Sequence, residues 1–165
     1  CMPAYIDRKN VDLFTKHAVL TETEMRARYE IHLENYCKVS AIEANTLLDM
    51  AQRRVLPAVA RYTGDLAKGM AHKQEADLAG FCRIEDHMIR RLSLQGGLLL
   101  DVCQDLAQAL EKAPAADSGI DAARYYRNEV AARTQKAGEL ISQLESLVDA
   151  KAWPYPTYAD ILFSV

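Results

Sequence analysis

The fold is decided by residues 81–112, which read FCRIEDHMIRRLSLQGGLLLDVCQDLAQALEK. Apolar residues recur there at alternating spacings of three and four, which is the seam of an amphipathic helix packed along a neighbour. This pattern predicts a helix from about Glu75 to Lys112, with Gln95 in its one polar seam position. Gly96 and Gly97 cost about 1 kcal/mol each relative to alanine, so they indicate a bend or a close approach of another backbone. The seam residues are Phe81, Ile84, Met88, Leu92, Leu99, Val102, Leu106 and Ala109.

Two capping-box patterns precede this helix, at residues 21–24 (TETE) and 40–43 (SAIE). In a capping box, the side chain of the residue that precedes the helix accepts a hydrogen bond from the backbone amide of the third helical residue. The glutamate at that third position accepts one in return from the backbone amide of the residue that precedes the helix. The first box predicts a helix to about Lys38 with Met25, Tyr29, Leu33 (or His32) and Tyr36 inward. The second box predicts a new helix that kinks at Pro57. We expect the turn into the next helix at residues 72–75. The second seam comprises Ala44, Leu47, Ala51, Val55, Ala58, Tyr62, Leu66 and Met70.

Pro, Asp, Ser and Gly cluster at residues 113–119 and predict a loop. A last long helix follows from about Asp121 to Ala150. Two prolines in the closing segment forbid a continued helix, so residues 153–165 are expected to form a separate tail. The seam of the last helix comprises Ala123, Tyr126, Val130, Ala137, Leu140, Leu144 and Leu147.

Composition agrees with a helical domain. The 165 residues are 50% apolar and 26% charged, with only seven Gly and five Pro, which suits one globular core and excludes disordered and collagen-like chains. We therefore predict an all-α fold, an antiparallel helical bundle of about four main helices. Residues 1–20 are expected to form an N-terminal arm with a short helix, 21–152 the bundle, and 153–165 an aromatic docking tail.

The net charge limits the kinds of binding partner, and the cysteine spacing indicates the cellular compartment. The formal net charge is −3, which gives no cationic field for a nucleic acid or an anionic membrane. No membrane-length apolar run occurs, and the four Cys show no C-x-x-C spacing, so a reduced cytoplasmic setting is favoured. The chain begins with Cys1 rather than Met, so we expect a processed or truncated product.

Catalytic motifs are missing. A di-iron bundle needs Glu-x-x-His on two helices, and no histidine here has a glutamate three residues before it. No nucleophile elbow, phosphate loop or zinc spacing is present. We therefore assign no catalytic, cofactor-binding or metal-ligating residue. A lone helical histidine leaves one alternative function open, an independent four-helix phosphotransfer or adaptor module with His72 or His87 as acceptor.

Aromatic residues gather near the two ends of the chain. Tyr5 and Phe14 lie near the start, and the C-terminal tail carries four more that we assign to partner docking, because Trp and Tyr lead interface hot spots. The competing interpretation is that the tail folds back and its tryptophan plugs the end of the bundle. These docking candidates are Trp153, Tyr155, Tyr158 and Phe163.

Several segments resemble the C-terminal helical domain of type III glutamine synthetases from about Pro3 to Val165. The most specific are Tyr36-Cys37-Lys38 and the tail Trp153-Pro154-Tyr155-Pro156-Thr157-Tyr158. The others are Arg28-Tyr29-Glu30, Glu34-Asn35, Ile42-Glu43-Ala44, Asp49-Met50-Ala51, Leu56-Pro57-Ala58 and Ile161-Leu162-Phe163.

This resemblance implies a parent enzyme of nitrogen metabolism and glutamine biosynthesis, a cytoplasmic, ring-forming ligase that joins ammonia to glutamate with ATP and Mg. The family's nucleotide, glutamate and metal ligands belong to a catalytic region expected upstream of this chain, and no position here matches their motifs. The chain by itself is therefore expected to be a non-catalytic structural, assembly or regulatory domain without a cofactor. Its expected partners are its own catalytic domain and neighbouring subunits of a homo-oligomer.

Overall fold

The computed structural model describes residues 2–156 and 158–163, and every regular element in them is a helix. The elements are α1 (Met2–Tyr5), α2 (Arg8–Lys16), α3 (Glu22–Met50), the π-helix η1 (Ala51–Val55), α4 (Leu56–Glu75), the 3₁₀ turn η2 (Ala79–Phe81), α5 (Arg83–Glu111), α6 (Gly119–Tyr125), the π-helix η3 (Tyr126–Ala131), α7 (Ala132–Glu145) and α8 (Tyr158–Phe163).

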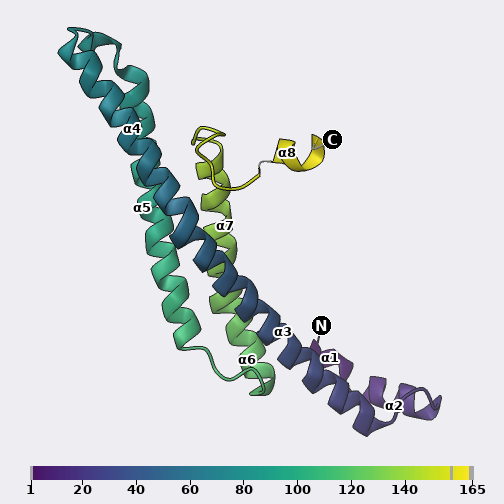
Figure 1. Cartoon of the computed structure of the whole chain (residues 1–165). Coiled ribbons are helices and arrows are strands. Elements are labelled where there is room, and N and C mark those ends of the chain that lie inside the picture. Colours follow the sequence, from purple (N-terminus) through teal and green to yellow (C-terminus); the bar gives the residue numbers. More distant parts are fainter. Residues whose placement is uncertain (1, 157, 164–165) are drawn as a thin grey trace.

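One continuous helical rod, α3–η1–α4, forms the long axis of the molecule (Figure 1). It begins at the predicted capping box: the Thr21 amide donates to Glu24 Oε2 at 2.8 Å, and the Glu24 amide donates to Thr21 Oγ1 at 3.2 Å. The predicted end near Lys38 is wrong, and the pattern at residues 40–43 caps nothing. No Gly or Pro occurs between residues 22 and 50, so ending the helix there would abandon backbone hydrogen bonds without relieving any strain.

Helix continuity across Pro57 is achieved by a π-helical turn. Proline in a helix interior lacks an amide donor and clashes with the carbonyl four residues earlier. Here the Leu56 amide donates to the carbonyl of Ala51, five residues back, in the turn directly before the proline. The wider turn gives the proline ring room, so the helix passes through Pro57 as predicted, and the distortion lies in η1.

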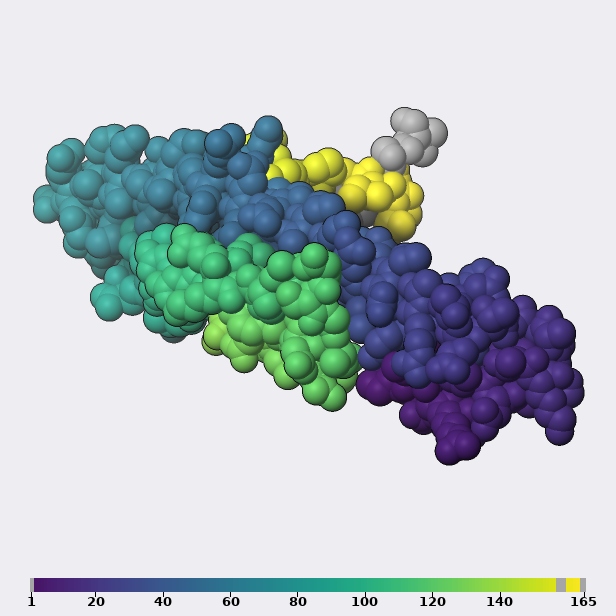
Figure 2. Space-filling model, turned by 90° about the horizontal axis from the view of Figure 1, so that it is seen from below, coloured from purple at the N-terminus to yellow at the C-terminus, as the bar shows by residue number. Residues whose placement is uncertain are grey.

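The remaining long helices fold back along this rod. Helix α5 runs antiparallel to α4, and the α6–η3–α7 stretch returns against α5 and α3 (Figure 1). The predicted all-α antiparallel bundle is confirmed, with α3 and α4 placed end to end rather than side by side. The molecule is elongated, with α1 and α2 at one end and the α4–α5 hairpin at the other (Figure 2).

The core lies where α3, η1, α5, η3 and α7 meet. In the described part of the chain, no polar or charged residue is buried, so packing of apolar surface provides the main stabilisation. The largest fully buried side chains are Met25, Val55, Leu92, Leu99, Leu106, Val130 and Leu144, together with Cys37 and Cys103.

Residues predicted at the ends of two apolar helix faces lie outside this core. Tyr36 is 40% exposed, and the neighbouring Cys37 is buried in its place, because the spacing from Leu33 to Cys37 keeps the same helix face. Phe81 and Ile84 are 73% and 74% exposed. Both lie at the α4–α5 turn, beyond the reach of α7, so no third helix covers them.

The N-terminal segment is more helical than the predicted arm. Helices α1 and α2 both fold against the start of α3, and Val11 is buried. The predicted loop at residues 113–119 is confirmed up to Gly119, whose φ of +72° suits glycine as α6 begins. Among the described residues, no helix is both long enough and apolar enough to cross a membrane.

Candidate interaction surfaces

The C-terminal tail turns back onto the bundle through Trp153, which is only 7% exposed and belongs to the main core. The amides of Ala152 and Trp153 donate to the carbonyl of Asp149 at 2.9 and 3.0 Å, and the Lys151 amide donates to Asp149 Oδ1 at 2.8 Å. These bonds form a tight turn that directs the indole inward. Its surface is therefore used within this chain.

The other predicted docking residues occupy different environments. Tyr155 packs against the core, and the Arg54 guanidinium carbon lies 6.0 Å from the centroid of its ring, a cation–π distance. Phe163 in α8 is 77% exposed. The side chain of Tyr158 lies outside the described residues. Docking through these residues stays a prediction, and Phe163 offers the free surface for it.

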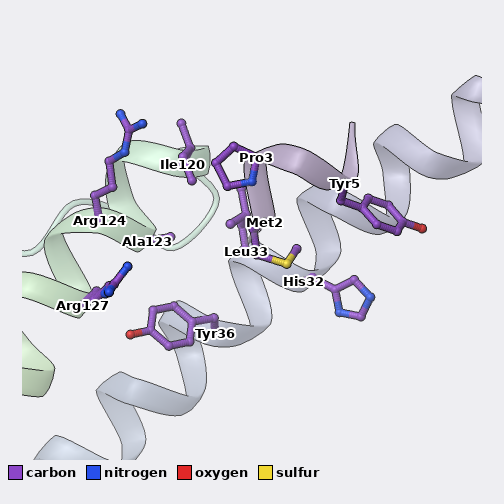
Figure 3. Close-up of a pocket in the computed structure, with 10 residues that line it drawn as sticks. All are labelled: Met2, Pro3, Tyr5, His32, Leu33, Tyr36, Ile120, Ala123, Arg124 and Arg127. Atoms are coloured by element: carbon purple, nitrogen blue, oxygen red, sulfur yellow. The ribbon is translucent and has the colours of Figure 1, made fainter. Parts of the chain in front are cut away.

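A groove with a cavity of about 760 Å³ lies between α1, α3 and α6 (Figure 3). Met2 and Pro3 of α1 lie over the gap between α3 and α6, and Leu33 and Ala123 line it below. Its volume is within the range of ligand-binding clefts, and its lining is mostly apolar with a few polar groups. The groove remains open to solvent, so it presents an apolar surface without a covering segment.

The polar side of this groove carries two arginines, and one of them is paired with a carboxylate. Arg124 and Arg127 come from α6 and η3, and Arg124 Nη1 lies 3.2 Å from Asp121 Oδ1. The Tyr36 hydroxyl points toward Arg127, whereas His32 lies on the side away from both arginines (Figure 3). Guanidinium groups bind carboxylates with good geometry. The arrangement suits an apolar segment that carries a carboxylate.

The sequence alone did not identify this groove. Its lining comes from three segments that are far apart in the chain, and the residues of α1 were expected to form part of an N-terminal arm. The only local signal was Tyr36, an aromatic residue one position away from the true inward position, Cys37. Tyr36 was therefore assigned to the core rather than to a surface.

The described residues hold no cluster of three or more His, Cys, Asp or Glu side chains that could bind a metal ion. Cys37, Cys82 and Cys103 are buried free thiols. Desolvation raises the pKa of Cys37 and of Cys103, which disfavours the reactive thiolate. His72 and His87 are exposed on α4 and α5.

At the end of the α4–α5 hairpin, an ion pair lies beside an exposed apolar patch. Lys73 Nζ lies 2.5 Å from Glu85 Oε1, and this hydrogen bond lowers the pKa of Glu85 and raises that of Lys73. Beside it, Leu78, Phe81 and Ile84 are 45%, 73% and 74% exposed. An ion pair thus ties the two helices together where no third helix packs.

Comparison with known proteins shows which family the chain resembles. The family described as "Glutamine synthetase C-terminal domain" matches residues 1–74. A glutamine synthetase of Butyrivibrio fibrisolvens is 30% identical over 165 residues, which is 100% of this chain and 24% of that protein. The type-3 glutamine synthetase of Dictyostelium discoideum is 27% identical over 164 residues, 94% of this chain and 22% of that protein.

A third relative, a glutamine synthetase of Bacteroides fragilis, is 24% identical over 166 residues, covering 97% of this chain and 22% of that protein. The chain thus spans about a quarter of the length of these relatives. The matches confirm the resemblance to the C-terminal domain of type III glutamine synthetases, and they give no support to a phosphotransfer or adaptor module. Residues 1–74 match the family model described as "Glutamine synthetase C-terminal domain", and the whole chain is similar to glutamine synthetases that include a type-3 enzyme.

Proposed function

We propose that this chain is a non-catalytic assembly domain of a type III glutamine synthetase, the cytoplasmic ligase that joins ammonia to glutamate with ATP and Mg in nitrogen metabolism. On this proposal ATP, Mg and glutamate are bound by the catalytic region of the parent enzyme. The domain contacts that region and neighbouring subunits of a homo-oligomer. Neither a nucleic acid nor a membrane is a partner.

The observation that carries the proposal is the distribution of apolar side chains. The core of the described residues contains no buried polar or charged residue, so no group suited to acid–base or nucleophilic catalysis is enclosed there. Large apolar side chains lie instead on the surface, at the hairpin end, along α3 and on α8. Such patches are typical of protein–protein contacts. Exposed examples are Ile31, Ile42, Phe81, Ile84, Leu162 and Phe163.

The rod gives these patches a fixed spacing. Helices α3, η1 and α4 together run from Glu22 to Glu75 without interruption, which is about 80 Å at 1.5 Å per residue. A stiff element of this length holds the hairpin end far from α1 and α2. It therefore supports contacts with two different bodies, such as a catalytic region and another subunit.

Two measurements test the proposal. The purified chain should form no glutamine from glutamate, ammonia and ATP, because the proposal places phosphoryl transfer in the catalytic region of the parent enzyme. The parent enzyme with residues 1–165 deleted should lose its assembled particle mass in light scattering. Ligase turnover by the chain alone would contradict the non-catalytic assignment. An unchanged particle mass after the deletion would contradict the assembly role.

A further inference from the structure

The outer part of the α4–α5 hairpin is thinly packed. We call residues 60–91 the arm, and Figure 1 shows the arm extending beyond the end of α7. Cys82 is the only buried residue of the arm, all of which is described, whereas α5 buries six residues between Leu92 and Ala109. Segments with few buried apolar contacts are the ones that move most readily in a folded chain. The arm is therefore held to the rest of the bundle, which we call the body, mainly through the two helices at its base.

Both helices are weakened at the same level, at the base of the arm. In the rod, Pro57 lacks an amide donor and lies just after the π-helical turn η1. In α5, Gly96 and Gly97 are each about 1 kcal/mol less favourable in a helix than alanine. A Cβ placed on Gly96 would lie 3.4 Å from Cγ1 of Val59, so Gly96 faces the rod two residues beyond Pro57. Helices bend at proline, at glycine and at π-turns, and all three occur together at this level.

Packing does not require glycine at these two positions. The 3.4 Å contact at Gly96 is an ordinary van der Waals distance, and no atom lies within 4 Å of a Cβ placed on Gly97. Both glycines have an ordinary helical φ, because Gly119 is the one described glycine with a positive φ. Of the two predicted reasons for this glycine pair, a close approach of another backbone is therefore wrong. The remaining reason is the freedom of the backbone to bend.

The end of α7 and the chain that follows it contact both helices at this level. Gln95, directly before Gly96, donates from Nε2 to Oε1 of Gln143 at 3.2 Å. The ring of Tyr155 lies 6.0 Å from the guanidinium carbon of Arg54, which belongs to η1. Between these two contacts the chain is anchored in the core by its tryptophan. Residues 143–155, which we call the clamp, therefore attach to both helices beside their weak points.

The contacts of the clamp are polar and weak enough to be reversible. Gln95 is the one polar residue of the α5 seam, and its Oε1 atom is buried without a hydrogen-bond partner in the described part of the chain. A buried acceptor without a partner costs about 1–3 kcal/mol, which an apolar residue at this position would avoid. Gln143 is exposed and Tyr155 is half-buried. A cation–π contact at such a site contributes only about 0.5–1 kcal/mol.

We propose that the clamp locks a hinge formed by Pro57 and the Gly96–Gly97 pair, and that release of the clamp lets the arm pivot on the body. A few residues at the ends of elements absorb the change in such hinges. While the clamp is closed, as it is here, the rod is stiff and the tip of the hairpin has one position. A clamp that binds only this arrangement shifts the equilibrium toward it. The device follows from contacts within one chain, so it does not depend on the proposed assembly role.

The test measures residual dipolar couplings of backbone amides in the purified chain labelled with ¹⁵N. A rigid molecule gives the same alignment for the arm and the body, whereas a pivoting arm has a smaller alignment than the body. Gln143→Ala with Tyr155→Ala removes both clamp contacts and leaves the core unchanged. The matched control is Gln135→Ala with Phe163→Ala, because the Gln135 side chain bonds within α7 to Glu139 and the Phe163 ring is exposed. Circular dichroism confirms that each variant is folded.

We expect one common alignment in the unaltered chain and in the control, and a loss of alignment confined to the arm in the clamp variant. Adding Gly96→Ala and Gly97→Ala to the clamp variant should restore the common alignment, because alanine stiffens α5 at the hinge. Adding Gly64→Ala and Gly69→Ala instead should not restore it, since these glycines lie within the arm.

Three results would overturn the inference. The first is separate alignments of arm and body in the unaltered chain, because the clamp would then lock nothing. The second is a common alignment in the clamp variant, or the same loss in its control. The third is a loss that persists with alanine at positions 96 and 97, or that alanine at 64 and 69 removes equally well, because the pivot would then lie elsewhere.

Discussion

Substitution Trp153→Ala should remove the anchor of the C-terminal tail. The indole is 93% removed from solvent, since 7% of its surface is exposed. A buried aromatic side chain covers about 150–250 Å², which at about 25 cal/mol per Å² corresponds to about 4–6 kcal/mol. Unfolded chains already cover part of that area, so the area-based figure is an upper bound. We expect a loss of about 3–5 kcal/mol, the usual range for Trp→Ala in a core.

The assay is urea unfolding followed by circular dichroism, together with thermal melting. For a domain of this size, 1 kcal/mol moves Tm by about 2–4 °C, so the variant should melt about 10 °C lower or more. Phe163→Ala is the matched control, because its ring is 77% exposed and its loss should cost less than about 0.5 kcal/mol. Equal effects of the two substitutions, or a change below about 1 kcal/mol at Trp153, would refute the assignment of the indole to the core.

Three smaller perturbations test other parts of the fold. Thr21→Ala removes the acceptor of the α3 capping box and should cost about 1 kcal/mol in urea unfolding. Gly97→Ala should stabilise by about 0.5–1 kcal/mol, because no atom lies within 4 Å of the added Cβ. Glu85→Gln should lower Tm at pH 7 by more than at pH 3. The hydrogen bond from Lys73 lowers the pKa of Glu85 in the folded state. The pair therefore stabilises the fold at pH values above the pKa of Glu85 in the unfolded chain, and this stabilisation is lost as the pH falls through its pKa in the folded state.

The sequence predicted the helices well because their signals are local. The capping box at residues 21–24 and the loop at 113–119 act through neighbouring backbone groups, and both occur in the structure. The capping-box pattern at residues 40–43 wrongly predicted the start of a new helix. Ser and Glu at that spacing are also compatible with a helix interior, and the buried face continues from Leu33 through Cys37 to Ala44. Tertiary packing therefore determined that the helix continues through residues 40–43 instead of starting there.

Periodicity predicted which face of a helix is apolar, and it could not predict how far a partner helix extends. Phe81 and Ile84 continue the seam of α5 by spacing, yet α7 does not reach them, so they stay exposed. The groove was unpredictable for a related reason. Met2, Leu33 and Arg127 share no local pattern, and only the folded arrangement of α1, α3 and η3 brings them together.

The position of Trp153 connects the stability of the bundle to the proposed clamp. The indole holds the chain at the end of α7, and the Arg54–Tyr155 contact holds it two residues later. Fixing the chain at the indole lowers the entropy lost when Tyr155 packs beside Arg54. Trp153→Ala is therefore expected to loosen the hinge as well as the fold, whereas Gln143→Ala with Tyr155→Ala loosens the hinge at a smaller loss of stability. Measuring the alignment of the arm in both variants at temperatures where both remain folded separates the two contributions, and an arm insensitive to Trp153 would show that the anchor has no part in presenting Tyr155.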